Sequence, residues 1–310
     1  MTPIAFVNRL PPTDEAIWLE ALAAAMPELA LRRLGDLTET ERALVEIAIV
    51  ANPDPADLGR LPNLKWVHST WAGVERLVSE LGAAAPPIIR LVDPELARTM
   101  AEAVLAWTYY LSRDMPAYAH AQRERRWAPR AYRHTQETTV GLLGLGALGA
   151  AAAPRLGDAG FKVTGWSRTP KELPGVTFQA DLADVLAQAD IVVCLTPLTA
   201  QTRGLLNAER LAQMKPGAAL INFARGPIVV TDDLLAALDA GRLSHAVLDV
   251  FDTEPLPASS PLWDHPAVTV LPHISAVTDR RTASLIVADN IRRYLDHGVI
   301  PQAVDFGRGY

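Results

Sequence analysis

The stretch that most constrains the fold of this chain is TVGLLGLGALG at residues 139–149. Its first half is an apolar run with the length of a buried strand, and its second half opens a helical pattern. Gly144 permits a tight turn, Gly146 lets a pyrophosphate approach the backbone, and Gly149 lets the helix pack closely against the strand. The stretch therefore predicts a strand, a turn and a helix that together bind a dinucleotide.

The helix that follows the turn is expected to contribute to the same site. It begins near Ala147, so the free N–H groups of Ala147 and Leu148 and the positive end of the helix dipole would face the phosphates. Pro154 lies inside this helix and cannot donate a hydrogen bond to Ala150. We therefore expect a kink or an early end of the helix at that position.

Short apolar runs alternate with helical patterns along the whole chain, which predicts an α/β fold with parallel sheets. Expected strands are 3–7, 46–50, 64–68 and 88–92 in a first set, and 139–143, 161–166, 190–195, 217–223, 245–250 and 267–271 in a second. Expected helices are 14–26, a segment after Gly73, 94–113, 147–159, 181–188, 208–213, 231–240 and 278–296. The second set is long enough for a complete doubly wound Rossmann domain.

A chain of 310 residues suits two domains. The last helical pattern, 278–296, has no strand of the second set beside which to pack, so we expect it to return to the first domain. The predicted domains are a discontinuous, flavodoxin-like substrate-binding domain at 1–94 plus 279–310, and a dinucleotide-binding Rossmann domain at 95–278.

Three residues follow expected strands in the second half of the chain. Arg225 comes after AALINFA, Glu254 after HAVLDVFDT and His273 after AVTVLP. Because ligands bind outside the carboxyl ends of strands in open parallel sheets, we expect all three in one crevice. Arginine can hold a carboxylate with two hydrogen bonds, an imidazolium can protonate a developing oxyanion, and a carboxylate beside the imidazole favours its charged form. The combination is suited to the reduction of a 2-keto acid.

Taken singly, each of these residues has an ordinary alternative: a packed or surface histidine, a turn-capping glutamate and a loop cation. Their co-occurrence after a dinucleotide fold is what favours catalysis. The other histidines lack this company and are expected to be structural or solvated; they are His68, His120, His134, His245, His265 and His297.

The second strand of the dinucleotide unit ends in WSRT at residues 166–169. Sites that prefer NAD usually have an acidic residue there to bind the ribose 2′-hydroxyl. Ser167, Arg168 and Thr169 instead suit a 2′-phosphate, so we predict NADPH as the preferred cofactor, with NADH possible; a solvated loop arginine is the alternative. Pro197, just after the strand expected at 190–195, is also assigned to the cofactor site.

Composition excludes several other classes. A net charge of −6 gives no reason to expect binding to nucleic acid or to an anionic membrane, and no apolar stretch has the length of a membrane span. The single cysteine, Cys194, lies in an apolar strand and rules out an internal disulfide and a cysteine-based zinc site. We expect no metal. The start of the chain does not look like a secretory signal, so a cytoplasmic protein is expected.

Four strings resemble the D-isomer-specific 2-hydroxyacid dehydrogenase family, and most closely its glyoxylate/hydroxypyruvate reductase A group. They are GLGALG (144–149), INFARGPIVVTDDLLAAL (221–238), LDVFDTEPLP (248–257) and LPHISA (271–276), together with WSRT and the closing RGY. The resemblance implies that Asp249 binds the nicotinamide carboxamide; a turn residue at the end of a strand is the alternative. It also implies that the turn containing Trp71, Ala72 and Gly73 binds the substrate carboxylate, although Trp71 could equally pack in the core. Residues 100–107 resemble the start of a helix at a homodimer interface.

The expected activity is NADPH-dependent reduction of small 2-keto acids: glyoxylate to glycolate and hydroxypyruvate to D-glycerate. The substrate site would comprise Trp71, Ala72, Gly73, Arg225 and His273. Trp71 stands where the family usually has glycine, so reduction of bulkier acids such as phenylpyruvate is an alternative. An alternative of another class is a dinucleotide-sensing binding module without turnover.

Overall fold

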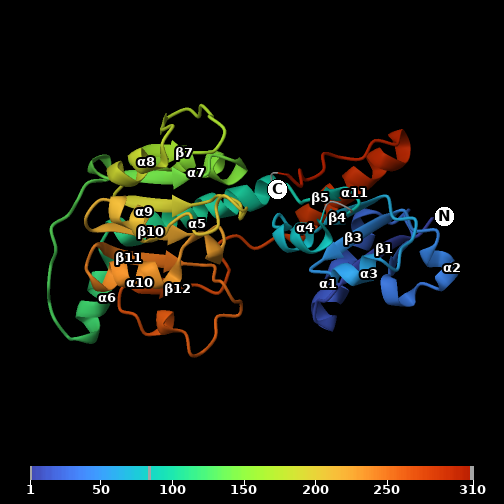
Figure 1. The fold of residues 1–310 in the computed structure, drawn as a ribbon, viewed down its shortest axis with the longest axis horizontal. Helices are drawn as coiled ribbons and strands as arrows, with labels where there is room; N and C mark the ends of the chain where they lie inside the picture. Colours follow the sequence, from blue (N-terminus) through green and yellow to red (C-terminus); the bar gives the residue numbers. More distant parts are fainter. Residues whose placement is uncertain (1, 83–84, 308–310) are drawn as a thin grey trace. The chain divides into compact units, whose positions relative to one another are not determined.

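The computed structural model describes residues 2–82 and 85–307, so the closing RGY lies outside the described part. The chain divides into two compact units, Met1–Glu95 with Thr278–Tyr310 and Leu96–Val277. We call them the N-terminal unit and the central unit. Each contains its own parallel sheet covered by helices (Figure 1), which confirms the predicted α/β class.

The central unit is built on a seven-stranded sheet in the order β12-β11-β10-β9-β6-β7-β8. All of its strand pairs are parallel. The strands are β6 (Thr139–Leu143), β7 (Lys162–Trp166), β8 (Val176–Phe178), β9 (Ile191–Cys194), β10 (Ala218–Asn222), β11 (Leu243–Leu248) and β12 (Val268–Val270). The order reverses between β6 and β9, which confirms the doubly wound Rossmann fold.

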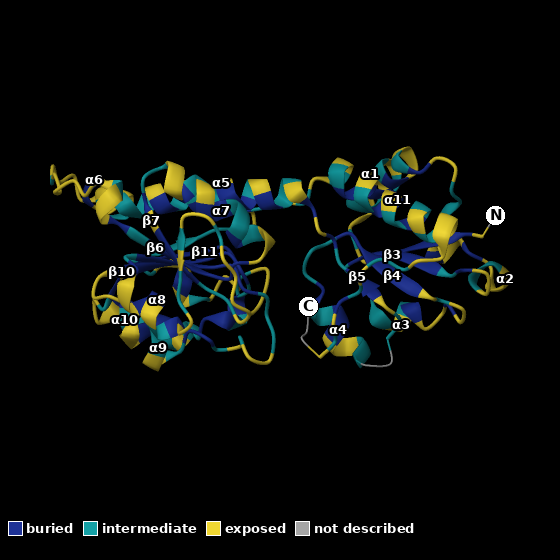
Figure 2. Cartoon of the chain, turned by 90° about the horizontal axis from the view of Figure 1, so that it is seen from above, coloured by how far each residue is buried: buried dark blue, intermediate teal, exposed yellow. Residues whose placement is uncertain are grey.

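Helices cover both faces of this sheet (Figure 2). On one face pack α5 (Pro94–Ser112) and α7 (Ala147–Asp158), with Val104 and Leu156 in a shared core. On the other pack α8 (Leu182–Gln188), α9 (Ala208–Gln213) and α10 (Thr231–Asp239). The remaining helical segments are α6 (Met115–Arg123), η3 (Thr135–Glu137), η4 (Gly226–Ile228) and η5 (Pro261–Trp263).

Helix α7 runs past Pro154 and ends at Asp158, so the expectation of an early end was wrong. Proline removes one backbone hydrogen bond, but it does not stop a helix whose apolar side is buried. Ala152, Ala153 and Leu156 are all buried against the sheet. Packing on both sides of Pro154 therefore outweighs the loss of a single bond.

The N-terminal unit has a five-stranded parallel sheet in the order β2-β1-β3-β4-β5, the flavodoxin-like order. Its strands are β1 (Ile4–Asn8), β2 (Leu31–Arg33), β3 (Ile47–Ala51), β4 (Trp66–Ser69) and β5 (Ile88–Ile89). Helices α1 (Pro12–Ala25) and α11 (Arg280–His297) share a core with one face, where Leu22 meets Val287 and Ile291. The other face is covered by η1 (Leu34–Asp36), α3 (Pro55–Leu58), α4 (Glu75–Leu81) and the loops beside them. The short helix α2 (Glu39–Arg42) lies between two of these loops.

Two strands and three α-helices were not predicted: β2, β8, α2, α3 and α6. The two strands lie at the edges of their sheets, where one side is open and an apolar run is not required. Strand β2 is LRR and carries two exposed arginines. Such strands form because a neighbouring strand supplies hydrogen bonds, so their own sequences carry little signal.

None of the helices in the described ranges combines the length and the apolar character needed to cross a bilayer.

Candidate active site

The three predicted catalytic residues follow three neighbouring strands of the central sheet. Arg225 lies just beyond β10, Glu254 beyond β11 and His273 beyond β12. Since the strands are parallel, all three residues leave the sheet at its carboxyl edge. The edge beside the dinucleotide turn therefore carries a cation, a carboxylate and an imidazole.

His273 and Glu254 form a hydrogen-bonded pair. The distance from His273 Nδ1 to Glu254 Oε2 is 2.7 Å. A carboxylate can only accept, so Nδ1 carries the proton and Nε2 is left for a substrate. The other oxygen, Glu254 Oε1, accepts from the N–H of Phe251 at 2.9 Å. The main chain thus fixes one oxygen of the Glu254 carboxylate, and the other oxygen orients the imidazole of His273.

The pair shifts the pKa values of both members. The hydrogen bond from Glu254 raises the pKa of His273 above its ordinary value, against the opposing effects of burial and of the Arg225 cation. Burial would raise the pKa of Glu254, but the hydrogen bonds from His273 and Phe251 outweigh it and lower that pKa. The geometry therefore favours an imidazolium next to a carboxylate, which is a proton donor suited to a developing alkoxide.

Asp249 holds the loop that carries His273. His273 has a left-handed backbone, with φ at 52°. The two carboxylate oxygens of Asp249 accept from the next two amides, Ile274 N at 2.7 Å and Ser275 N at 2.9 Å. Asp249 is 1% exposed. Sequence resemblance assigned this residue to the nicotinamide carboxamide; its main-chain contacts add a positioning role that only the structure could reveal.

Arg225 is positioned by Asn222, which sequence reasoning missed. Asn222 is 1% exposed at the end of β10. Its Nδ2 donates to the carbonyl of Arg225 at 3.0 Å, and its Oδ1 accepts from Ala224 N at 3.2 Å. The Arg225 guanidinium itself donates through Nη1 to the Ala224 carbonyl at 2.6 Å. The only signal in the sequence was an asparagine within an otherwise apolar strand.

Gly226 brings the Arg225 loop against the Glu254 turn. A Cβ at this position would overlap the backbone of Phe251 and Asp252. Any larger residue would thus force apart the segments that hold the cation and the carboxylate. The chain signals this contact only as a glycine directly after the arginine, which sequence reasoning did not single out.

The glycine turn has the geometry expected of a pyrophosphate cradle. Gly144 has φ at 108°, and a Cβ there would come within 2.9 Å of the carbonyl of Leu195. A Cβ on Gly149 would overlap the carbonyl oxygen of Gly144, so the helix and turn touch. A Cβ on Gly146 would meet nothing within 4 Å. The two flanking glycines serve packing, and the middle one faces open space where a ligand could approach.

Helix α7 begins without a capping side chain, since Gly146 is its N-cap. The first N–H groups, including those of Ala147 and Leu148, have no partner within a helix and are available to an anion. Thr196, at the end of β9, is 6% exposed, and its hydroxyl has no hydrogen-bond partner among the described residues. An orphaned buried hydroxyl beside an open cradle fits a bound dinucleotide. Sequence reasoning missed Thr196.

The other predicted cofactor residues lie at the ends of β7 and β9. Arg168 and Thr169 are exposed just after β7. The hydroxyl of Ser167 donates to the carbonyl of Thr169 at 2.7 Å, so it would have to turn to donate to a phosphate. Pro197 is half-buried after β9, and its carbonyl accepts from the Thr202 hydroxyl at 2.7 Å.

The predicted carboxylate-binding turn belongs to the N-terminal unit, where it follows β4. Trp71 N–H donates to Ser69 Oγ at 3.0 Å, and the Trp71 carbonyl accepts from Leu91 at 3.0 Å. The N–H groups of Ala72 and Gly73 have no acceptor within residues 2–82 and 85–307. The turn is anchored at Trp71 and presents two main-chain donors.

Titratable residues away from the site include buried packing groups and members of surface ion pairs. Burial lowers the pKa values of His68 and His245 to about 4, and it raises that of Cys194 to about 12. His265 contacts Asp239, and His120 contacts Glu124. His273 is thus distinguished from the other histidines by a carboxylate partner at the carboxyl edge of the sheet.

Comparison with known proteins places this geometry in a family. Residues 105–275 match the family model described as D-isomer specific 2-hydroxyacid dehydrogenase, NAD binding domain. A D-isomer specific 2-hydroxyacid dehydrogenase from Xanthobacter autotrophicus Py2, solved with NADPH and MES, is 43% identical. The alignment covers 100% of this chain and 99% of that one, with a TM-score of 0.91.

Two further structures agree over their full lengths, with 100% of both chains covered. An NADPH-dependent glyoxylate/hydroxypyruvate reductase from Sinorhizobium meliloti, solved with NADP and sulfate, is 34% identical with a TM-score of 0.91. A probable 2-hydroxyacid dehydrogenase from Rhizobium etli CFN 42, solved with NADP, HEPES and L(+)-tartaric acid, is 33% identical with a TM-score of 0.90. The chain belongs to the D-isomer specific 2-hydroxyacid dehydrogenase family.

Proposed function

We propose that this protein is an NADPH-dependent reductase of small 2-keto acids, converting glyoxylate to glycolate and hydroxypyruvate to D-glycerate. The observation that carries the proposal is the His273–Glu254 pair, with its 2.7 Å hydrogen bond, next to Arg225 on the neighbouring strand end. The likeness to an NADPH-dependent glyoxylate/hydroxypyruvate reductase supports the choice of substrates.

In this proposal each residue has one task. Arg225 binds the substrate carboxylate with two parallel hydrogen bonds and polarises the neighbouring carbonyl. Bound NADPH supplies the hydride that reduces the keto carbon. His273 donates the proton on Nε2 to the keto oxygen as negative charge develops there. Glu254 keeps the imidazole protonated and in the required tautomer.

The N–H groups of Ala72 and Gly73 are proposed as further partners of the substrate carboxylate. Both amides lack an acceptor within the described ranges. Main-chain donors suit this task because they bind a planar anion without having to order a long side chain. Trp71 is proposed to border the same site and to limit the size of the substrate.

The dinucleotide is assigned to the turn at Gly144, Gly146 and Gly149 and to the first amides of α7. Arg168, with Ser167 and Thr169, is proposed to recognise the 2′-phosphate, and no acidic residue stands in WSRT to repel it. The NADPH and NADP bound to the relatives support this preference. Asp249 is proposed to contact the nicotinamide carboxamide while it holds the His273 loop.

We also propose a homodimer in the cytoplasm. Trp127 is 99% exposed, and Tyr132, Tyr118 and Met115 near it in sequence are exposed as well. Large apolar side chains in such numbers on one segment are typical of an interaction surface. Light scattering should give twice the chain mass of 33.5 kDa, and Trp127→Ser should shift the mass towards one chain. A wild-type protein of single-chain mass would reject the dimer.

The test of function is the oxidation of NADPH and of NADH with glyoxylate, hydroxypyruvate, pyruvate and phenylpyruvate, followed by nicotinamide absorbance. Fast NADPH oxidation with the small acids is expected. Turnover of phenylpyruvate alone would keep the chemistry and replace the substrate class with bulkier acids. Tight NADPH binding without turnover of any acid would reject the reductase in favour of a dinucleotide-sensing module.

A further inference from the structure

Asn52 has a left-handed backbone at the carboxyl edge of the sheet in the N-terminal unit. It follows β3, and its φ is 49°, in the region that asparagine adopts more readily than most residues other than glycine. The sheet order reverses between β1 and β3, and ligands of open parallel sheets bind at the carboxyl edge next to such a reversal. Left-handed residues other than glycine persist where surrounding contacts hold them, often at functional sites.

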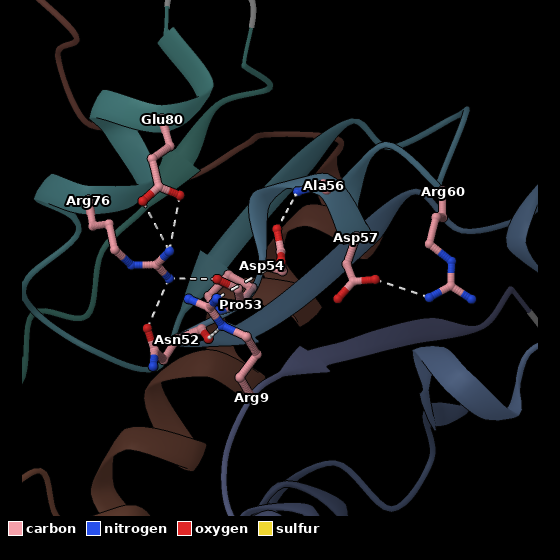
Figure 3. Close-up of polar contacts among 9 residues, drawn as sticks. All are labelled: Arg9, Asn52, Pro53, Asp54, Ala56, Asp57, Arg60, Arg76 and Glu80. Carbon is pink, nitrogen blue, oxygen red and sulfur yellow. Dashed lines mark hydrogen bonds and ion pairs between the residues drawn. The ribbon is translucent and has the colours of Figure 1, made fainter.

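Two arginines from different segments hold Asn52 (Figure 3). Arg76, on α4, donates through Nη2 to Asn52 Oδ1 at 2.9 Å and to the Pro53 carbonyl at 2.6 Å. Glu80 holds the same guanidinium through Nη1 at 3.0 Å. Arg9, after β1, donates through Nε to the Asn52 carbonyl at 3.3 Å. Both the backbone and the side chain of Asn52 are therefore fixed.

These contacts settle the orientation of the Asn52 carboxamide. A guanidinium has donors only, so the oxygen of the carboxamide must face Arg76 and the NH₂ must face away. Within residues 2–82 and 85–307, the Nδ2 of Asn52 has no hydrogen-bond acceptor. Two arginines therefore fix Asn52, and its NH₂ group remains available as a hydrogen-bond donor.

Asn52 is the first residue of the loop after β3, and this loop is next to the proposed carboxylate-binding turn. Strands β3 and β4 pair with Val50 opposite Ser69, and Thr70 N–H still donates to the Val50 carbonyl at 2.9 Å. The two chains separate after this bond, so Asn52 and Trp71 start adjacent loops. The carboxyl edge of this one sheet therefore carries the loop of Asn52 and, on the neighbouring strand, the loop of Ala72 and Gly73.

We propose that Asn52 determines substrate specificity by donating a hydrogen bond from Nδ2 to an oxygen on C3 of the keto acid. The ligand class is a 2-keto acid whose C3 carries a hydroxyl, as in hydroxypyruvate. Pyruvate has hydrogen in place of that hydroxyl, and glyoxylate has no C3. The inference rests on the proposed function and narrows it from small keto acids to a 3-hydroxylated one.

The test compares hydroxypyruvate with pyruvate, which differ only by the C3 hydroxyl. The variant is Asn52→Gly, because glycine adopts a left-handed backbone without strain and removes only the side chain. The quantity measured is kcat/KM for hydroxypyruvate divided by kcat/KM for pyruvate, with NADPH. Loss of one neutral hydrogen bond should lower this ratio roughly five- to tenfold.

Two further variants complete the experiment. Arg76→Met removes the hydrogen bond that orients the Asn52 carboxamide. It should lower the same ratio by a smaller factor, because the carboxamide itself remains. Arg60→Gln is the matched control, because Arg60 forms an exposed ion pair with Asp57 at 3.0 Å on α3 and the loop after it, away from Asn52 (Figure 3). It should leave the ratio within about twofold of wild type, as expected of a surface pair.

The outcomes separate this inference from the function on which it rests. A wild-type enzyme that prefers hydroxypyruvate, with a ratio that falls in Asn52→Gly and holds in Arg60→Gln, supports the assignment. An active wild type whose ratio is unchanged in a folded Asn52→Gly overturns the role of Asn52 and leaves the reductase intact. Absence of turnover of both acids by the wild type overturns both proposals.

Discussion

The carboxyl edges of the two sheets carry different kinds of chemistry. The edge of the central unit carries charged side chains: Glu254 pairs with His273, and Arg225 is next to them. At the edge of the N-terminal unit, the exposed donors are main-chain amides and one carboxamide, and the arginines Arg9 and Arg76 hold the loop. In the proposed function, the first edge moves a proton, and the second binds the substrate without a change of charge.

The difference explains why one edge was easier to recognise than the other. Reactive side chains are specific residue types, so their positions after strands can be read from the sequence. Main-chain donors are present at every residue except proline, and only the fold decides which of them remain unpaired. Variants at each edge should accordingly fail in different ways.

The largest effect should come from His273→Gln. Glutamine keeps polarity but cannot act as the acid, so kcat should fall by roughly 10²- to 10⁴-fold. Binding of NADPH, measured by fluorescence titration, should change little. A variant that retains most of its kcat would show that the proton comes from elsewhere and would remove the contrast between the two edges.

Arg225→Lys should have the next largest effect. Lysine keeps the charge but loses the planar fork that holds a carboxylate with two hydrogen bonds. We expect kcat/KM to fall roughly 10- to 100-fold, the effect of losing a charge-assisted hydrogen bond. Steady-state kinetics with hydroxypyruvate measures it. Equal activity of the lysine variant would mean that charge alone suffices and that the main-chain amides fix orientation.

Gly226→Ala tests whether the central edge depends on backbone contact as well as on charge. The added Cβ would overlap the backbone of Phe251, so stability should fall by about 1–3 kcal/mol in urea unfolding, with a loss of activity. Gly157→Ala is the matched control, because a Cβ there meets nothing within 4 Å in α7. It should stabilise the protein by about 0.5–1 kcal/mol. Equal stability of the two variants would contradict the close approach.

Glu254→Gln should change the pH dependence of the reaction. In the proposed reaction, reduction requires protonated His273, so kcat/KM should fall as pH rises through the pKa of His273. The carboxylate raises that pKa, so its replacement should move the fall to lower pH. Glutamine offers one acceptor where glutamate offers two, and either His273 or Phe251 loses its partner. An unmoved pH profile would show that the pair does not set the proton donor.

The smallest effect is expected from Arg168→Ala, at the end of β7 on the same sheet. It should raise the KM for NADPH while leaving the KM for NADH nearly unchanged, because only NADPH carries the 2′-phosphate. Parallel titrations of the two cofactors measure the difference. An equal rise for both would assign Arg168 to a general role in the loop.

Much of the central unit could be predicted from sequence because its signals are local. The glycine turn, the buried strands and the positions of Arg225, Glu254 and His273 each follow from a short string. The role of Asn222 could not be predicted, because one asparagine in an apolar strand does not specify the short-range hydrogen bonds that it makes to Ala224 and Arg225. The edge strand β8 could not be predicted either, because it forms by pairing with β7. Helix α7 passed Pro154 for the same reason: its stability comes from packing on the sheet.

The fold class, the dinucleotide turn and the residue types that can bind a carboxylate and donate a proton all follow from the amino-acid sequence alone. These depend on hydrophobic period and side-chain chemistry, which are properties of each short segment. The folded structure was needed to show that Asp249 holds the His273 loop, that Gly226 touches Phe251, and that Asn52 presents a fixed amide donor. Those contacts join residues from separate segments of the chain, and burial and hydrogen bonding between distant segments are set when the whole chain folds.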